Sequence, residues 1–124
     1  MPISILVIER EPQVMQRLLG LFRRAGYAPL LASSPCAAAA VLETERFDVV
    51  LTDDGDGVMS AEQLARGLRE RWPASAPPVV RMTSDASEEP SALFAATVKR
   101  PVDALELLHV VDVVARRHAP RSCA

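Results

Sequence analysis

Four short apolar segments of this 124-residue sequence each end in side chains that could do chemistry. The first two segments end in acidic groups, the third in hydroxyls and the fourth in basic groups. In chain order these side chains are Glu9, Arg10 and Glu11; Asp53 and Asp54; Thr83 and Ser84; and Lys99 and Arg100. Carboxylates are oxygen ligands for magnesium, and basic side chains pair with anionic oxygens. The polarity of loops explains any one of these residues, but the ordered set of four predicts a functional site.

The segments that carry these groups have the pattern of strands buried on both faces. Residues 4–8 and 47–52 are continuous apolar runs, and residues 28–32, residues 79–83 and the surroundings of Val98 complete a set of five. Helical signals separate the strands: an apolar stripe at Val14, Leu18, Leu21 and Phe22, and capping pairs at Ser60 with Gln63 and at Asp103 with Glu106. This alternation predicts a parallel sheet with helices on both faces and a site at the carboxyl ends of the strands.

Composition limits the class of protein. The 14 basic and 16 acidic residues give a formal charge of −2, so we do not expect nucleic acid to be bound through bulk charge. We expect one domain over residues 1–118 and a tail over residues 119–124. No apolar run approaches the roughly 20 residues of a membrane span, and the start of the chain does not have the pattern of a signal peptide. The two cysteines form no spaced framework, and we therefore expect a cytoplasmic protein.

The order of these motifs resembles a response-regulator receiver domain of two-component signalling, and the resemblance covers nearly the whole chain. It rests on ILVIERE at the first strand, FDVVLTD at the third, VVRMTS at the fourth and KRPVDALELL over the fifth strand and the last helix. It implies a flavodoxin-like (βα)5 three-layer sandwich with a five-stranded parallel sheet. It also implies a signalling role in a phosphorelay, with no turnover of a small-molecule substrate.

By its position after FDVVLT, Asp53 matches the phosphoacceptor of that family. A carboxylate that attacks a phosphoryl group must overcome repulsion between anions, and a magnesium ion relieves it by bridging the acids and the phosphoryl oxygens. The resemblance implies a metal site formed by Asp53, Glu9 and the backbone carbonyl of Gly55, with Glu11 as a further acid. It gives Thr83 the role of binding a phosphoryl oxygen.

Basic residues depart from the family pattern at two positions of this site. Arg10 stands where the second of two adjacent acids is usual, and a guanidinium there would repel a metal ion and could pair with Asp53. Arg100 stands where a lysine before a proline pairs with the acyl phosphate, and Lys99, the only lysine in the chain, comes one residue earlier. Consecutive strand residues point to opposite faces, so only one of the two can easily reach the site, and position favours Arg100.

Two further departures concern the fourth and fifth strands. Thr97 replaces an aromatic residue whose rotation reports phosphorylation in ordinary receivers. The stretch from Thr83 to Arg100 is several residues shorter than usual and contains Pro90, so we expect a fourth helix that is very short or absent. Arg81 lies on the same face as Thr83, where a shortened covering element would let its charge reach water. The side chain could equally extend past apolar neighbours to do so.

Two other functions remain open. The departures at Arg10, Arg100 and Thr97 favour a phosphorylation-independent pseudo-receiver that works as a protein-interaction module. The run Asp54-Gly55-Asp56-Gly57-Val58 is similar to the motif of haloacid-dehalogenase-type phosphatases, in which the first aspartate is a nucleophile and the second an acid/base. Too little sequence follows that run for the later elements of such a phosphatase.

The partners that the receiver resemblance implies are proteins. A sensor histidine kinase or a phosphotransfer protein would supply the phosphoryl group, and a downstream protein or a second copy of the chain would receive the signal. The resemblance implies no direct contact with nucleic acid or a membrane.

Overall fold

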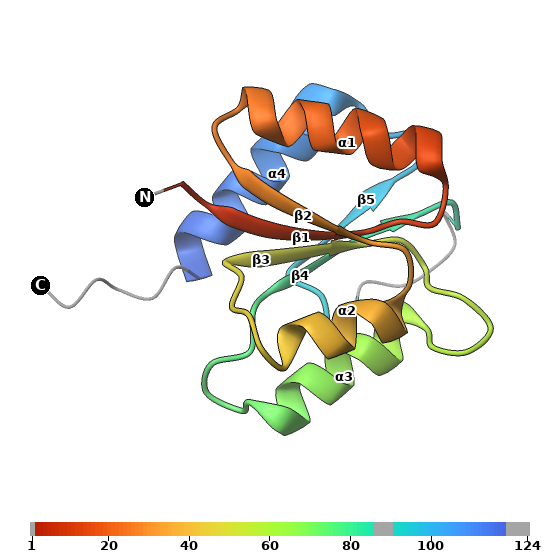
Figure 1. The fold of residues 1–124 in the computed structure, drawn as a ribbon, viewed down its shortest axis with the longest axis vertical. Helices are drawn as coiled ribbons and strands as arrows, with labels where there is room; N and C mark the ends of the chain where they lie inside the picture. The colour runs from red at the N-terminus through yellow and green to blue at the C-terminus, as the bar shows by residue number, and fades with distance from the viewer. Residues whose placement is uncertain (1, 86–90, 119–124) are drawn as a thin grey trace, which may run out of the picture.

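The computed structural model describes residues 2–85 and 91–118 and is built around a parallel sheet (Figure 1). Its strands are β1 (Ser4–Ile8), β2 (Ala28–Ala32), β3 (Val49–Thr52), β4 (Val79–Thr83) and β5 (Ala96–Lys99). They lie in the order β2-β1-β3-β4-β5, and all neighbouring strands are parallel. The predicted sheet is confirmed, except that β3 begins two residues later than expected. Asp48, just before it, instead accepts hydrogen bonds from the backbone N–H and the hydroxyl of Ser4.

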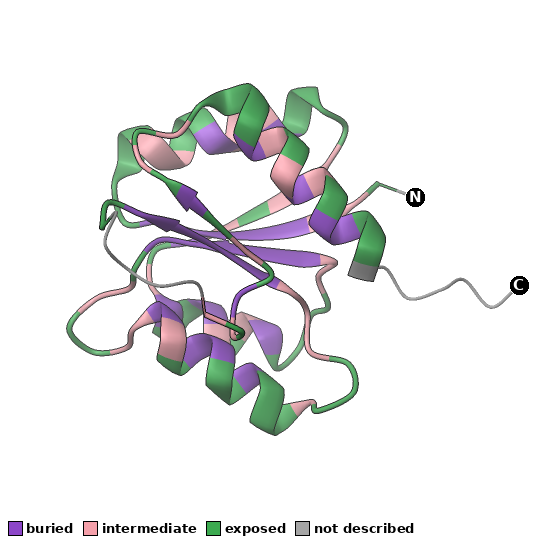
Figure 2. Cartoon of the chain, turned by 180° about the vertical axis from the view of Figure 1, so that it is seen from behind, coloured by how far each residue is buried: buried purple, intermediate pink, exposed green. Residues whose placement is uncertain are grey.

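Helices cover both faces of this sheet (Figure 1). The helices α1 (Pro12–Arg24) and α4 (Ala104–His118) pack on one face, and α2 (Pro35–Leu42) and α3 (Ala61–Arg71) pack on the other. Strands β1, β3 and β4 are buried almost throughout, as Figure 2 shows. Their side chains alternate between the two apolar layers, which explains why the strand sequences are apolar at every position.

Local sequence signals fix where the helices begin. The hydroxyls of Ser34 and Ser60 accept hydrogen bonds from N–H groups in the first turns of α2 and α3, and the Gln63 side chain completes a capping box at Ser60. The carboxylate of Asp103 accepts two N–H groups at the start of α4. Gly26 ends the first helical unit with a φ of 85°, a conformation that favours glycine. Within the described residues, no helix is long and apolar enough to cross a membrane.

The connection between β4 and β5 breaks the alternation of strands and helices. Its described residues, 84–85 and 91–95, contain no helix, and the next helix along the chain is α4, after β5. This agrees with the expectation that one helix is missing or very short. Pro90 and the expected tail over residues 119–124 lie outside the described residues.

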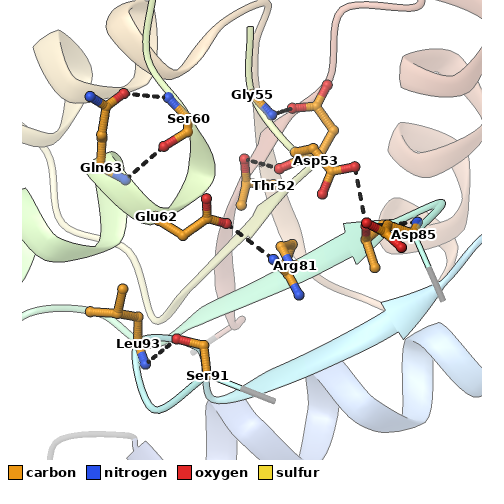
Figure 3. A network of polar contacts seen from close by, with 12 residues as sticks. Thr52, Asp53, Gly55, Ser60, Glu62, Gln63, Arg81, Asp85, Ser91 and Leu93 are labelled. Carbon is orange, nitrogen blue, oxygen red and sulfur yellow. Dashed lines mark hydrogen bonds and ion pairs between the residues drawn. The ribbon is translucent and has the colours of Figure 1, made fainter. Parts of the chain in front are cut away.

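Arg81, in the middle of β4, is a charged side chain inside the covered layer and is only 2 % exposed. Its guanidinium lies 3.1 Å from a carboxylate oxygen of Glu62 in α3 and 4.7 Å from the ring centre of Phe94 (Figure 3 shows the ion pair). The expectation that a shortened connection exposes Arg81 to water is therefore wrong. The connection instead turns Phe94 inward, so that a carboxylate and an aromatic ring surround the cation.

We predict that Glu62→Gln lowers the free energy of unfolding by about 1–2 kcal/mol, because it removes a carboxylate from a buried cation. The value is below that of a fully buried pair because the Glu62 side chain is 41 % exposed. Arg81→Met keeps an apolar side chain of similar length against Phe94, so the double variant should be no less stable than Glu62→Gln alone. Urea unfolding of the three variants measures these energies. If the loss of stability in the double variant equalled the sum of the losses in the two single variants, the pairing of Arg81 with Glu62 would be contradicted.

Candidate functional site

The sheet order brings the ends of β1, β3, β4 and β5 to one edge of the molecule. Glu9 and Asp53 directly follow β1 and β3, Thr83 is the last residue of β4, and Arg100 directly follows β5. The two carboxyl groups are nearly enclosed, since Glu9 is 2 % and Asp53 is 8 % exposed. Residues that are up to 91 positions apart in the sequence therefore form one polar cluster at the ends of strands whose buried side chains are mostly apolar.

An ion pair between Arg100 and Glu9 spans this cluster. Arg100 donates from Nη2 to Oε2 of Glu9 at 2.5 Å, and the other carboxylate oxygen of Glu9 accepts the backbone N–H of Glu11 at 3.3 Å. The backbone N–H of Arg100 also donates to the carbonyl of Thr83 at 2.8 Å, and the Arg100–Pro101 peptide bond is cis. Both ends of the pair are thus held by backbone contacts, and the buried charge of Glu9 is compensated within the protein.

Asp53 sits beside this pair with one oxygen fixed. Its Oδ1 accepts the backbone N–H of Gly55 at 2.9 Å, and its own N–H donates to the carbonyl of Ile8 on β1. Burial raises the pKa of Asp53 above its ordinary value of 3.8, and the nearby charge of Glu9 acts in the same direction. The Gly55 hydrogen bond and the positive charges of Arg10 and Arg100 oppose this shift. The net result is a carboxyl group that ionises less readily than a free aspartate.

A tight loop behind Asp53 sets the position of the Gly55 amide. Gly55 has a φ of 92°, and a side-chain carbon there would lie 2.5 Å from the carbonyl oxygen of Met59. The carboxylate of Asp56 accepts the backbone N–H groups of Val58 and Met59, each at 2.9 Å, and these bonds lower the pKa of Asp56. Glycine is thus required at position 55, and Asp56 serves to shape the loop.

Thr83 binds a residue that the sequence did not single out as its partner. Its hydroxyl donates to Oδ2 of Asp54 at 3.2 Å and accepts the backbone N–H of Asp85 at 3.1 Å. Adjacent residues of an extended chain point to opposite sides of a sheet, which agrees with the contact of Thr83 with Asp54 in place of Asp53. That alternation could have suggested the pairing, but only with the knowledge that β3 and β4 are neighbours.

The structure does not bring Lys99 or Glu11 into the cluster. The Lys99 side chain is exposed and alternates with Arg100, which is the basic residue that reaches the acidic groups. The Glu11 side chain is also exposed, and its contact with Glu9 is made through the backbone. The side chains that meet are therefore those of Glu9, Asp53 and Arg100, with the charge of Arg10 acting on Asp53.

Comparison with known proteins indicates the family to which this chain belongs. No family model matches the chain. Protein Rrf1 of Nitratidesulfovibrio vulgaris is 32 % identical over 120 residues, which cover 90 % of this chain and 82 % of that protein. The heme response regulator HssR of Staphylococcus saprophyticus is 26 % identical over 120 residues, covering 93 % of this chain and 52 % of HssR, so the chain spans about half of its length.

Solved structures of the same architecture are receiver domains. The chemotaxis response regulator CheY4 of Vibrio cholerae superposes with a TM-score of 0.83 at 20 % identity, over 92 % of this chain and 99 % of that one. The receiver domain of sensor histidine kinase PA1611 of Pseudomonas aeruginosa gives 0.82 at 20 % identity, over 94 % and 99 %. The chain belongs to the response-regulator receiver family.

As a receiver domain, the chain is a signal-receiving module of the phosphorelay type. The phosphatase alternative built on Asp54 and Asp56 has no support, because the comparisons point to receivers and not to phosphatases. The contacts agree, since Asp54 accepts a hydrogen bond from Thr83 and Asp56 is engaged by its own loop.

The PA1611 receiver is described with a magnesium ion in its active site cleft, but the side chains of this receiver do not fit such an ion. Within residues 2–85 and 91–118, no group of three Asp, Glu, His or Cys side chains could hold a metal. Of the acids implied by the resemblance, Glu9 is already paired with Arg100, and Arg10 adds a second positive charge beside Asp53. A divalent cation would meet repulsion here where it needs oxygen ligands.

Stability should depend on the charge of Asp53 in a direction set by its raised pKa. The folded receiver holds a proton on Asp53 more tightly than the unfolded chain does, so stability falls as pH rises from about 4 through the folded-state pKa. We predict that Asp53→Asn raises the urea midpoint at neutral pH and that the gain shrinks on acidification.

Asp56→Asn provides the matched control for this experiment. The pKa of Asp56 is lowered in the folded state, so its effect on stability has the opposite pH dependence. The ionised form of Asp56 favours folding, and that contribution to stability is lost as pH falls. An Asp53→Asn gain that did not change with pH would show that its cause is not the ionisation of Asp53.

Proposed function

We propose that this receiver accepts a phosphoryl group on Asp53 from a sensor histidine kinase or a phosphotransfer protein. The observation that carries the proposal is the environment of Asp53 itself. Its carboxyl group lies at the carboxyl end of a central strand and is held at Oδ1 by the Gly55 N–H, and the positive charges of Arg10 and Arg100 lower its pKa. None of the residues that the structure describes donates a hydrogen bond to Oδ2, the oxygen that would attack phosphorus.

The residues of the cluster then have separate roles. A carboxylate oxygen of Asp53 attacks the phosphorus, the new O–P bond forms as the P–N bond to the donor histidine breaks, and the histidine ring leaves. Arg100 offers N–H donors that match phosphoryl oxygens, and Thr83 can donate its hydroxyl once it releases Asp54. The chain turns over no small-molecule substrate beyond this transfer and its hydrolytic reversal.

The phosphorylated state would be read by protein contact. The partners that we propose are the upstream phosphoryl donor and a downstream protein or a second copy of the receiver. Thr97, on the exposed side of β5, has no aromatic ring with which to report the state of the site. The rearrangement of Thr83 and Asp54 is the nearest change that could convey it.

A pseudo-receiver that signals without phosphorylation is the second candidate, and one observation favours it. In this structure the two groups that would bind phosphoryl oxygens are already engaged by acids, Thr83 by Asp54 and Arg100 by Glu9. In that reading the polar cluster has a structural role, and the partner binds one fixed conformation.

We predict that acetyl phosphate adds one phosphoryl group to the wild-type receiver and none to Asp53→Asn, measured by intact mass after a short incubation. Asp54→Asn serves as the matched control, because it changes the neighbouring acid and leaves Asp53 in place. A phosphoryl adduct that persists in Asp53→Asn, or no adduct in any form of the protein, would overturn the assignment of Asp53. The second of these results would favour the pseudo-receiver.

A further inference from the structure

The cluster around Asp53 carries its own positive charge. Two acids, Glu9 and Asp53, are enclosed at the ends of β1 and β3, and two arginines, Arg10 and Arg100, act on them. When both acids are ionised, the net charge of these four side chains is zero. A divalent cation added to them would leave a local excess of two positive charges, at a place with little access to water.

We infer that Asp53 is phosphorylated without a bound divalent metal, because Arg10 and Arg100 supply the positive charge that the transfer requires. This inference rests on the function proposed above and specifies the chemistry of the same site. Arg10 and Arg100 are the two positions at which this site departs from the receiver pattern.

Arg100 makes the first contribution, through its ion pair with Glu9. The Glu9 carboxylate is 3 % exposed and already has a cation at one oxygen and a backbone N–H at the other. To ligate a metal, Glu9 would have to give up Arg100, and the guanidinium, which is 25 % exposed, would then lie next to the metal ion. The ion pair therefore opposes metal binding in two ways: Arg100 occupies the carboxylate that would be a ligand, and its positive charge repels the metal ion.

Arg10 makes the second contribution from the loop that follows β1. Its side chain is exposed, and its charge acts on Asp53 and also on Asp56 across the β3–α3 loop. Arg10 directly follows the buried Glu9, and an exposed arginine next to an enclosed acid can reach a phosphoryl group that arrives from solvent. Its planar guanidinium can bind two phosphoryl oxygens at once.

The transfer from acetyl phosphate balances with these groups alone. The Asp53 carboxylate forms a bond to phosphorus, the bond between phosphorus and the acetyl oxygen breaks, and acetate leaves with the electron pair. Asp53 changes from a monoanion to an acyl phosphate dianion. The two guanidinium groups stabilise this additional negative charge. In a site with more acids, a metal ion bound by oxygen ligands would do so.

A metal-binding experiment tests the inference without reference to phosphorylation. We predict that titration calorimetry with magnesium chloride detects no saturable binding to the wild-type receiver and detects it for Arg10→Asp, which adds a carboxylate beside Glu9. Arg10→Gln removes the charge without adding a ligand and should bind more weakly than Arg10→Asp. Arg66→Gln, at an exposed position on α3, controls for the loss of an arginine elsewhere. Saturable binding by the wild type would overturn the inference.

Phosphorylation in the presence and absence of metal gives the second test. With acetyl phosphate, labelling of Asp53 in EDTA should equal that in magnesium to within about twofold, and Arg10→Gln should reduce it by about tenfold, the loss expected for one hydrogen bond to a charged group. Labelling that depends on Asp53 but appears only with magnesium would overturn the inference and leave the proposed function standing. Absence of Asp53-dependent labelling in both media would overturn the proposed function.

Discussion

Helices cover the central strands of this receiver on both faces, and that constraint decides where polar groups can lie. Side chains along β1, β3 and β4 meet apolar layers on either side, so charge is excluded from most of their length. The strands run in the same direction, and their carboxyl ends therefore collect the polar residues at one edge. The cluster of Glu9, Asp53 and Arg100 is a consequence of this architecture, and its low exposure makes each charge depend on the others.

Arg81 tests how strict that constraint is. A cation in the middle of a covered strand is tolerated because two neighbouring elements contact it: α3 offers the carboxylate of Glu62, and the β4–β5 connection offers the ring of Phe94. Arg69 of α3 also donates to the carbonyl of Ala92 in the same connection. The described part of this connection is thus held near α3 by Arg69 directly and by Arg81, which contacts both Glu62 and Phe94. Polar contacts here hold a segment that lacks the apolar stripe with which a helix would pack.

Sequence patterns predicted the strands, the helices and the residues of the site, but they predicted few of the contacts between those residues. The apolar runs located the five strands, the Ser60 and Gln63 pair located α3, and the position directly before Pro101 favoured Arg100 over Lys99. Each of these signals is local, and local signals survive without knowledge of which strands are neighbours. They give the residues that end each strand, which is why Asp53 and Thr83 could be named.

The contacts that could not be predicted all cross between strands or layers. The hydrogen bond from Thr83 to Asp54 and the ion pair from Arg100 to Glu9 depend on sheet order, and the burial of Arg81 depends on where Phe94 turns. The contact that opposes the metal site implied by the resemblance is of the same kind. Residue types suggested ligands, but the partner that Glu9 actually has is 91 positions away in the sequence.

The same separation bears on how the domain assembles. Glu9 and Asp53 can be brought together by β1 and β3, but Arg100 reaches them only when the last strand has joined the sheet. The charge of Arg100 compensates Glu9 only where the last strand is paired with β4. Loss of β5 from the sheet would therefore remove apolar contacts and also leave the charge of Glu9 without its partner, so β5 stabilises the domain electrostatically as well as by burial.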